Sequence, residues 1–113
     1  MKEYINIIQE IMPPNAEIES NTVSKDLVIS VSWPLKTDPD RPNKRSKTIA
    51  IRISGEATSD FNALPDAMKQ GALNRLNSVI ASNLKSFDPE HNKPYNSPVP
   101  VEDWLITSAQ LIG

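Results

Sequence analysis

Asp88, Glu90 and His91 stand together in the run D-P-E-H, and Glu102 and Asp103 follow after a proline-rich loop. Carboxylates and an imidazole can hold a divalent cation or transfer protons. The chain has a single histidine and no cysteine, which leaves few ways to build a metal-binding histidine cluster or a nucleophilic triad. The run also closes a predicted helix and enters a polar loop, where such side chains are usually solvated. We therefore predict no catalytic, metal or cofactor site.

The loop 36–47, KTDPDRPNKRSK, holds five cationic residues against two aspartates. A cationic loop stiffened by two prolines can reach the phosphates of a nucleic acid or another anion. Connecting loops are also commonly charged, and the two aspartates can pair with cations of the same loop. The residues that would make anion contacts are Lys36, Arg41, Lys44, Arg45, Lys47 and, from the polar face of the following strand, Arg52.

Tyr95 lies within the proline-rich loop 88–100, DPEHNKPYNSPVP. An exposed tyrosine on a stiff loop can anchor a protein partner, and it can equally fold back over the end of the preceding helix. Trp33 differs because it is in phase with the apolar side of its strand. We therefore predict that Trp33 packs in the core and that Tyr95 is a candidate partner anchor.

Composition limits the class of protein. The 113 residues carry a net charge of −2 and are 38% hydrophobic, which argues against disorder and against a strongly basic nucleic-acid binder. No apolar run approaches the roughly 18 residues of a membrane span, and the first residues do not read as a signal peptide. No phosphate-binding loop or hydrolase motif occurs. We expect one cytoplasmic domain over residues 1–113.

The elements that position these residues follow from hydrophobic periodicity. Segment 65–87 has the clearest helical period: Pro65 suits a first helical position, and Asp88 precedes a proline that stops the helix. Candidate caps precede it in the run 59–62. The apolar half of this helix is formed by Met68, Ala72, Leu73, Leu76, Val79, Ile80, Leu84 and Phe87.

Two segments, 26–35 and 48–54, alternate apolar and polar residues and predict strands with one buried face. A short helix over 2–12 is expected before them, with its apolar side formed by Tyr4, Ile5, Ile8, Ile11 and Met12. A short strand is expected over 16–19, with a turn at Ser20-Asn21. The last segment, 101–112, alternates loosely and is interpreted as a strand that rejoins the sheet.

These elements predict a two-layer α+β sandwich in the order α-β-β-β-α-β. A small antiparallel sheet of three or four strands is covered on one face by the long amphipathic helix and the short N-terminal helix. Edge strands of such a sheet invite strand addition. We therefore expect a non-enzymatic interaction module that binds a protein partner or itself. The alternative is binding of RNA or DNA through the loop 36–47.

Overall fold

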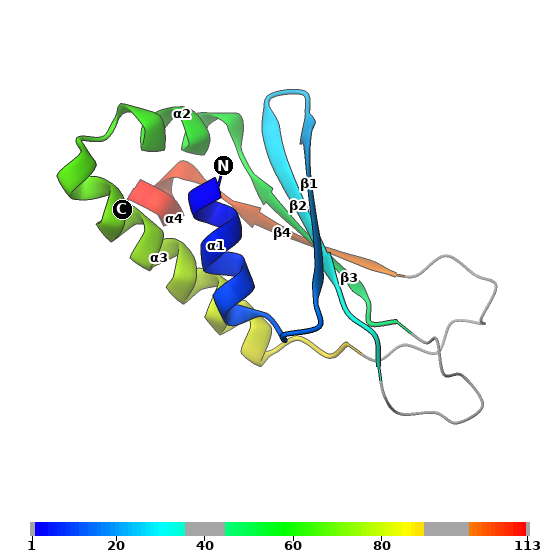
Figure 1. Cartoon of the computed structure of the whole chain (residues 1–113). Coiled ribbons are helices and arrows are strands. Elements are labelled where there is room, and N and C mark those ends of the chain that lie inside the picture. Colours follow the sequence, from blue (N-terminus) through cyan, green and yellow to red (C-terminus); the bar gives the residue numbers. More distant parts are fainter. Residues whose placement is uncertain (1, 36–44, 90–99, 113) are drawn as a thin grey trace.

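The computed structural model describes residues 2–35, 45–89 and 100–112, and Figure 1 shows the helices gathered on one side of the strands. The elements in chain order are α1 (Lys2–Ile11), β1 (Glu17–Val23), β2 (Asp26–Ser32), β3 (Thr48–Ile53), α2 (Gly55–Ala63), α3 (Asp66–Lys85), β4 (Val101–Ile106) and α4 (Ser108–Ile112). The predicted α+β class and the predicted order of the main elements are confirmed.

The four strands form one sheet in the order β1-β2-β3-β4. The first three strands pair antiparallel, as expected, but β4 pairs parallel to β3. The sheet is therefore mixed and not wholly antiparallel. The reason is the connection, because α2 and α3 carry the chain back to the end at which β3 begins, so β4 must run in the same direction as β3.

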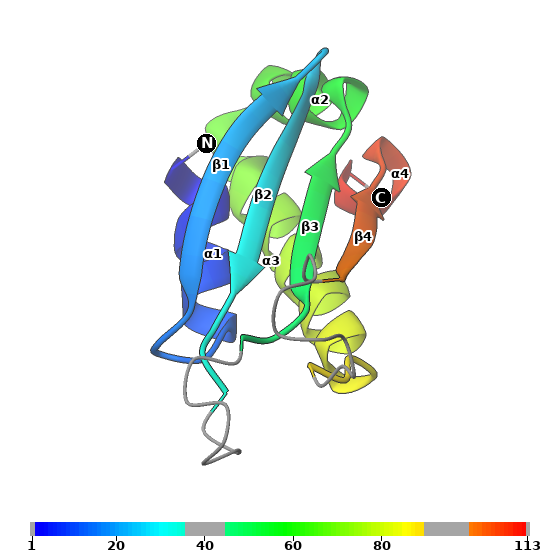
Figure 2. The same ribbon diagram turned by 90° about the vertical axis from the view of Figure 1, so that its right-hand side faces the viewer.

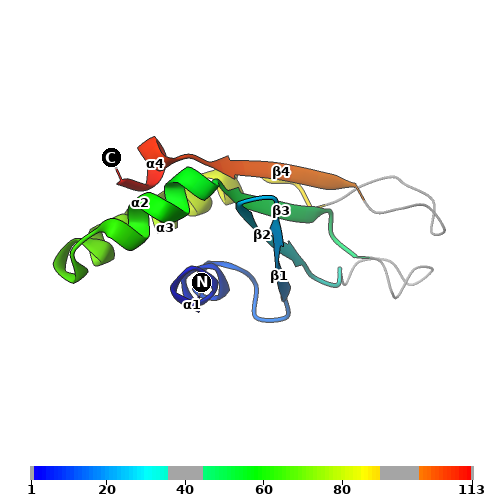
Figure 3. The same cartoon turned by 90° about the horizontal axis from the view of Figure 1, so that it is seen from above.

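The helices of the described chain lie on one face of the sheet, and no described helix covers the opposite face (Figures 2 and 3). The inward residues of β2 and β3 meet α3 in the core, where Val31, Ile51, Leu76 and Ile80 have no exposed surface. Full burial of such a side chain stabilises the fold by roughly 1.5–3 kcal/mol. The predicted packing of the long helix on the sheet is confirmed.

The helix α3 is slightly shorter than the predicted 65–87, because Pro65 occupies the N-cap position and Ser86 the C-cap position. Its expected apolar face is buried or half-buried apart from Met68, which is 57% exposed. Met68 lies in the first turn of α3, which extends beyond the sheet in Figure 1. Periodicity places a residue on a helix face but does not show where the covering sheet ends.

The helix α2 was not predicted, since its segment was interpreted as a source of caps. Ser54 begins it, with the Ser54 side chain accepting a hydrogen bond from the Ala57 N–H at 3.0 Å. Only Ala57 and Phe61 of this helix are buried. Two buried residues in nine give a weak period, which is why the sequence pattern did not reveal the helix.

The strand β1 is longer than the predicted 16–19, and the predicted turn at Ser20-Asn21 is wrong. The chain reverses instead at Ser24-Lys25, between the paired residues Val23 and Asp26. Ser24 adopts a φ of 58°, the left-handed conformation that tight hairpin turns use.

The final strand ends at Ile106, and the predicted strand over 101–112 is wrong beyond that point. The last residues form α4, which buries Leu111 against the core. Among the residues that the structure describes, no helix combines the length and the apolarity needed to cross a membrane.

Candidate functional site

The strand β1 is the most exposed element of the sheet. It pairs with β2 on one side, and the described chain places no strand on its other side (Figure 2). Of its seven residues only Ile18 is half-buried, and the other six are exposed. Within the described residues, β1 therefore has no second strand neighbour, and of its side chains only Ile18 packs against the core.

The direction of the outward backbone groups of β1 follows from one hydrogen bond. The Thr22 N–H donates to Oδ1 of the adjacent Asn21 at 3.0 Å, so this N–H faces away from the ladder with β2. Alternate residues of a strand direct their backbone groups to the same edge. The backbone groups of Ile18 and Ser20 therefore face the same open edge as those of Thr22.

The other edge strand, β4, is half covered. Trp104 and Ile106 are buried on the helix side, whereas Val101 and Leu105 are 59% and 56% exposed. Glu102 lies on the helix side and accepts a hydrogen bond from Trp104 Nε1 at 3.2 Å. Asp103 alternates with it and lies on the open face of the sheet.

The structure describes Arg45, Lys47 and Arg52 of the predicted anion site, and both arginines contact carboxylates. Arg45 forms a bidentate contact with Glu17, with 3.1 Å between Nη2 and Oε2 and 3.4 Å between Nη1 and Oε1. Its Nη2 also donates to Ser32 Oγ at 2.8 Å. Arg45 therefore ties the end of the loop to β1 and β2.

Arg52 lies at the other end of β3 and contacts Asp26 across the β2–β3 ladder, with 3.0 Å between Nη1 and Oδ2. It does not continue a patch with Arg45, since the strand separates them. Lys47 is half-buried, and its backbone N–H donates to the Pro89 carbonyl. Lys36, Arg41 and Lys44 lie outside the described residues.

The D-P-E-H run is described only at Asp88 and Pro89, since Glu90 and His91 lie outside the described residues. Within residues 2–35, 45–89 and 100–112, no group of three or more acidic or histidine side chains is placed to hold a metal ion. Glu102 and Asp103 alternate on β4 and so point to opposite faces of the sheet.

Tyr95 also lies outside the described residues, so its predicted role as an anchor stays a prediction. Trp33 is 8% exposed, which confirms its place in the core. The ring of Phe87 lies edge-on between Trp33 and Trp104, with centroid separations of 5.8 and 5.9 Å. These three rings close the core beneath the end of α3.

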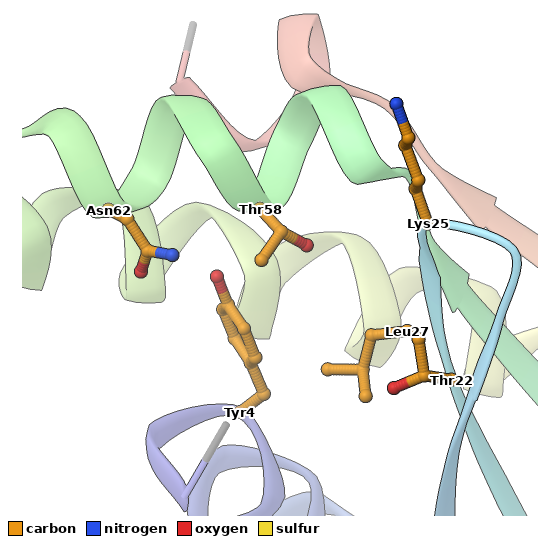
Figure 4. A pocket seen from close by; sticks show the side chains of 6 residues that line it. All are labelled: Tyr4, Thr22, Lys25, Leu27, Thr58 and Asn62. Carbon is orange, nitrogen blue, oxygen red and sulfur yellow. The ribbon is translucent and has the colours of Figure 1, made fainter.

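A pocket of about 190 Å³ lies between α1, α2 and the hairpin that joins β1 to β2 (Figure 4). Its lining residues are Tyr4, Thr22, Lys25, Leu27, Thr58 and Asn62. Sequence reasoning placed Tyr4 on the apolar side of the first helix but gave no sign of this pocket. No local signal marks it, because its walls come from three segments that are distant in the sequence.

Comparison of the chain with protein-family models, with curated proteins and with solved structures found no match.

Proposed function

We propose that this protein is a non-enzymatic cytoplasmic interaction module that pairs with a second copy of itself through β1. The observation that supports this proposal is the exposure of β1, a seven-residue strand with one strand neighbour in the described chain and six exposed residues. Unpaired N–H and C=O groups along such an edge favour the addition of another strand. Antiparallel pairing of two β1 strands would join the two sheets into one.

The register of this pairing follows from the edge geometry. A twofold axis at Ser20 sets Ser20 of the two copies opposite each other and sets Ile18 opposite Thr22. All three residues direct their backbone groups to the open edge, so the backbone bonds of the pairing would form at these positions, and the Thr22 N–H would exchange its bond to Asn21 Oδ1 for one across the axis. This register also keeps the helices of both copies on the same face of the joined sheet.

Charge favours the same register. With the axis at Ser20, Glu19 of one copy lies opposite Asn21 of the other, and Glu17 lies opposite Val23. No two glutamates are then directly opposed, which avoids a destabilising like-charge pair. We place the contact at β1 and not at β4 because β1 is the more exposed edge strand, with six exposed residues against four in β4.

The test is a proline substitution within the proposed contact. Thr22→Pro removes an N–H that faces the open edge, and edge strands tolerate proline at such positions. Thr22→Val is the matched control, since it removes the same hydroxyl but keeps the N–H. We expect the wild type and Thr22→Val to dimerise as concentration rises and Thr22→Pro to stay monomeric, measured by light scattering after size exclusion.

Hydrogen exchange locates the contact independently of the variants. On dilution of the dimer, the amides of Ile18 and Thr22 should lose protection, while those of β4 should not change. A wild type that remains monomeric at millimolar concentration would contradict the proposal. So would a dimer whose concentration-dependent protection appears on β4.

The alternative function, nucleic-acid binding through the loop 36–47, ranks second because Arg45 and Arg52 are already paired with carboxylates. It would predict retention on a nucleic-acid column that falls steeply with salt and weakens when Arg41 and Lys44 are both replaced by glutamate. Unchanged retention of that double variant would exclude this function.

A further inference from the structure

The pocket between α1 and α2 contains a buried hydroxyl without a partner. Tyr4 is only 2% exposed, and its hydroxyl makes no hydrogen bond within the described part of the chain. Figure 4 shows this hydroxyl directed from α1 toward α2, in the space near Thr58 and Asn62. A buried polar group without a hydrogen bond is costly, so a bound molecule that accepts this O–H gains free energy.

The tyrosine is held in this orientation and stays a donor. Its ring packs against Phe61, with 5.2 Å between the centroids. Burial, and to a lesser degree the Glu3 carboxylate, raises the pKa of Tyr4 to about 12. The hydroxyl is therefore protonated at neutral pH and requires an acceptor atom on the bound molecule.

The volume limits the size of that molecule. At about 190 Å³, the pocket is smaller than the roughly 300–1,000 Å³ of sites for drug-sized ligands. It is somewhat larger than an apolar cavity of about 150 Å³ that accepts benzene. A single six-membered ring with one small polar substituent matches this space.

The walls favour a neutral compound with both an apolar and a polar end. Leu27 and the ring of Tyr4 supply apolar surface. Thr58 Oγ1 already donates to the Ser54 carbonyl at 3.1 Å, which leaves its lone pairs to accept a hydrogen bond from a ligand. Lys25 directs its amino group away from the Tyr4 hydroxyl in Figure 4. The Glu3 carboxylate acts electrostatically on this hydroxyl, so a negatively charged ligand bound to the hydroxyl is disfavoured.

We propose that this pocket binds a small neutral cyclic carboxamide. Its carbonyl oxygen accepts the Tyr4 O–H, its amide N–H₂ donates to Thr58 Oγ1 or to the Asn62 side chain, and its ring lies against Leu27. An adjacent donor and acceptor on one planar group match the adjacent hydroxyl and acceptor atoms of the protein.

The experiment is a titration with cyclohexanecarboxamide, followed by backbone amide shifts in two-dimensional NMR spectra. For the wild type we expect saturable shifts in 2–12 and 55–63, with a dissociation constant of about a millimolar for so few ligand atoms. Tyr4→Phe keeps the ring but removes the donor, so affinity should fall by about tenfold. Thr48→Val, on the open face of the sheet, is the control and should bind like the wild type.

A second ligand separates recognition of the amide from simple filling of the pocket. Cyclohexanecarboxylate has the same ring but carries a negative charge, so it should produce no saturable shift at these residues. Should Tyr4→Phe not fold, Thr58→Val replaces it and is likewise expected to weaken binding. Equal affinity of the wild type and the variant for the carboxamide, equal binding of the carboxylate, or no saturable shift would overturn the proposal.

Discussion

The carboxylate of Asp26 accepts a hydrogen bond from the backbone N–H of Gly55, with 2.9 Å between Oδ1 and the nitrogen. The other oxygen of the same carboxylate binds Arg52 at the end of β3. The Asp26 side chain on β2 therefore holds both the end of β3 and the first turn of α2. A negative charge at the beginning of a helix is also favoured by the helix dipole.

This contact predicts a dependence of stability on acid pH. The Gly55 N–H, followed by the Arg52 guanidinium, lowers the pKa of Asp26 from its ordinary value of 3.8. Because the pKa is lower in the folded state, the ionised carboxylate contributes stability above pH 3.8, and this contribution is lost as the pH falls through the folded pKa. Asp26→Asn should flatten this decrease, measured as urea midpoints of both proteins across the acid range. Parallel pH curves would contradict the assignment.

Substitution of alanine for the two described helical glycines should have opposite effects on the free energy of unfolding. A Cβ at Gly55 would lie 2.8 Å from the Lys25 carbonyl oxygen and 2.9 Å from Lys25 Cβ, so the hairpin turn would have to move. Gly55→Ala should therefore destabilise the fold by about 1–3 kcal/mol. A Cβ at Gly71 meets nothing within 4 Å, so Gly71→Ala should stabilise α3 by about 0.5–1 kcal/mol. Urea unfolding of the pair measures both signs, and a stabilising Gly55→Ala would refute the close approach.

Two apolar residues of α3 should differ sharply when truncated. Leu76 has no exposed surface, so Leu76→Ala should cost about 2–5 kcal/mol through lost burial and a new cavity. Met68 is 57% exposed, so Met68→Ala should change the free energy of unfolding by no more than about 0.5 kcal/mol. Denaturant titration of both variants provides the comparison. Similar losses at both positions would mean that the first turn of α3 is also covered.

Tyr4 predicts a loss of stability at alkaline pH. Burial raises its pKa in the folded state to about 12, above the ordinary value of 10.0. The unfolded chain therefore loses this proton first, and stability should decline as the pH rises above 10. Tyr4→Phe should lack this part of the decline when urea midpoints are followed from neutral pH upward. A wild type and a variant with identical alkaline curves would show that the hydroxyl is solvated.

The buried faces of the main elements can be predicted from local hydrophobic patterns. Ile51 and Val31 fall on the inward side of strands that alternate apolar and polar residues, and Ile80 falls on the inward side of a helix with a clear period. These patterns are local, because a buried face must repeat every two residues in a strand and about every 3.6 in a helix. The same reasoning underestimated β1, since a strand exposed on both faces carries no alternation.

The contacts between distant segments, in contrast, become visible only in the folded chain. Three features each join residues that are far apart in the chain. They are the parallel pairing of β4 with β3, the contact of Asp26 with Gly55, and the pocket that Tyr4 of α1 and residues of α2 line together. Periodicity reports whether a side chain faces inward, but it holds no information on which inward group it will meet. That outcome depends on how whole elements pack, and packing is fixed by the shapes of all the surfaces at once.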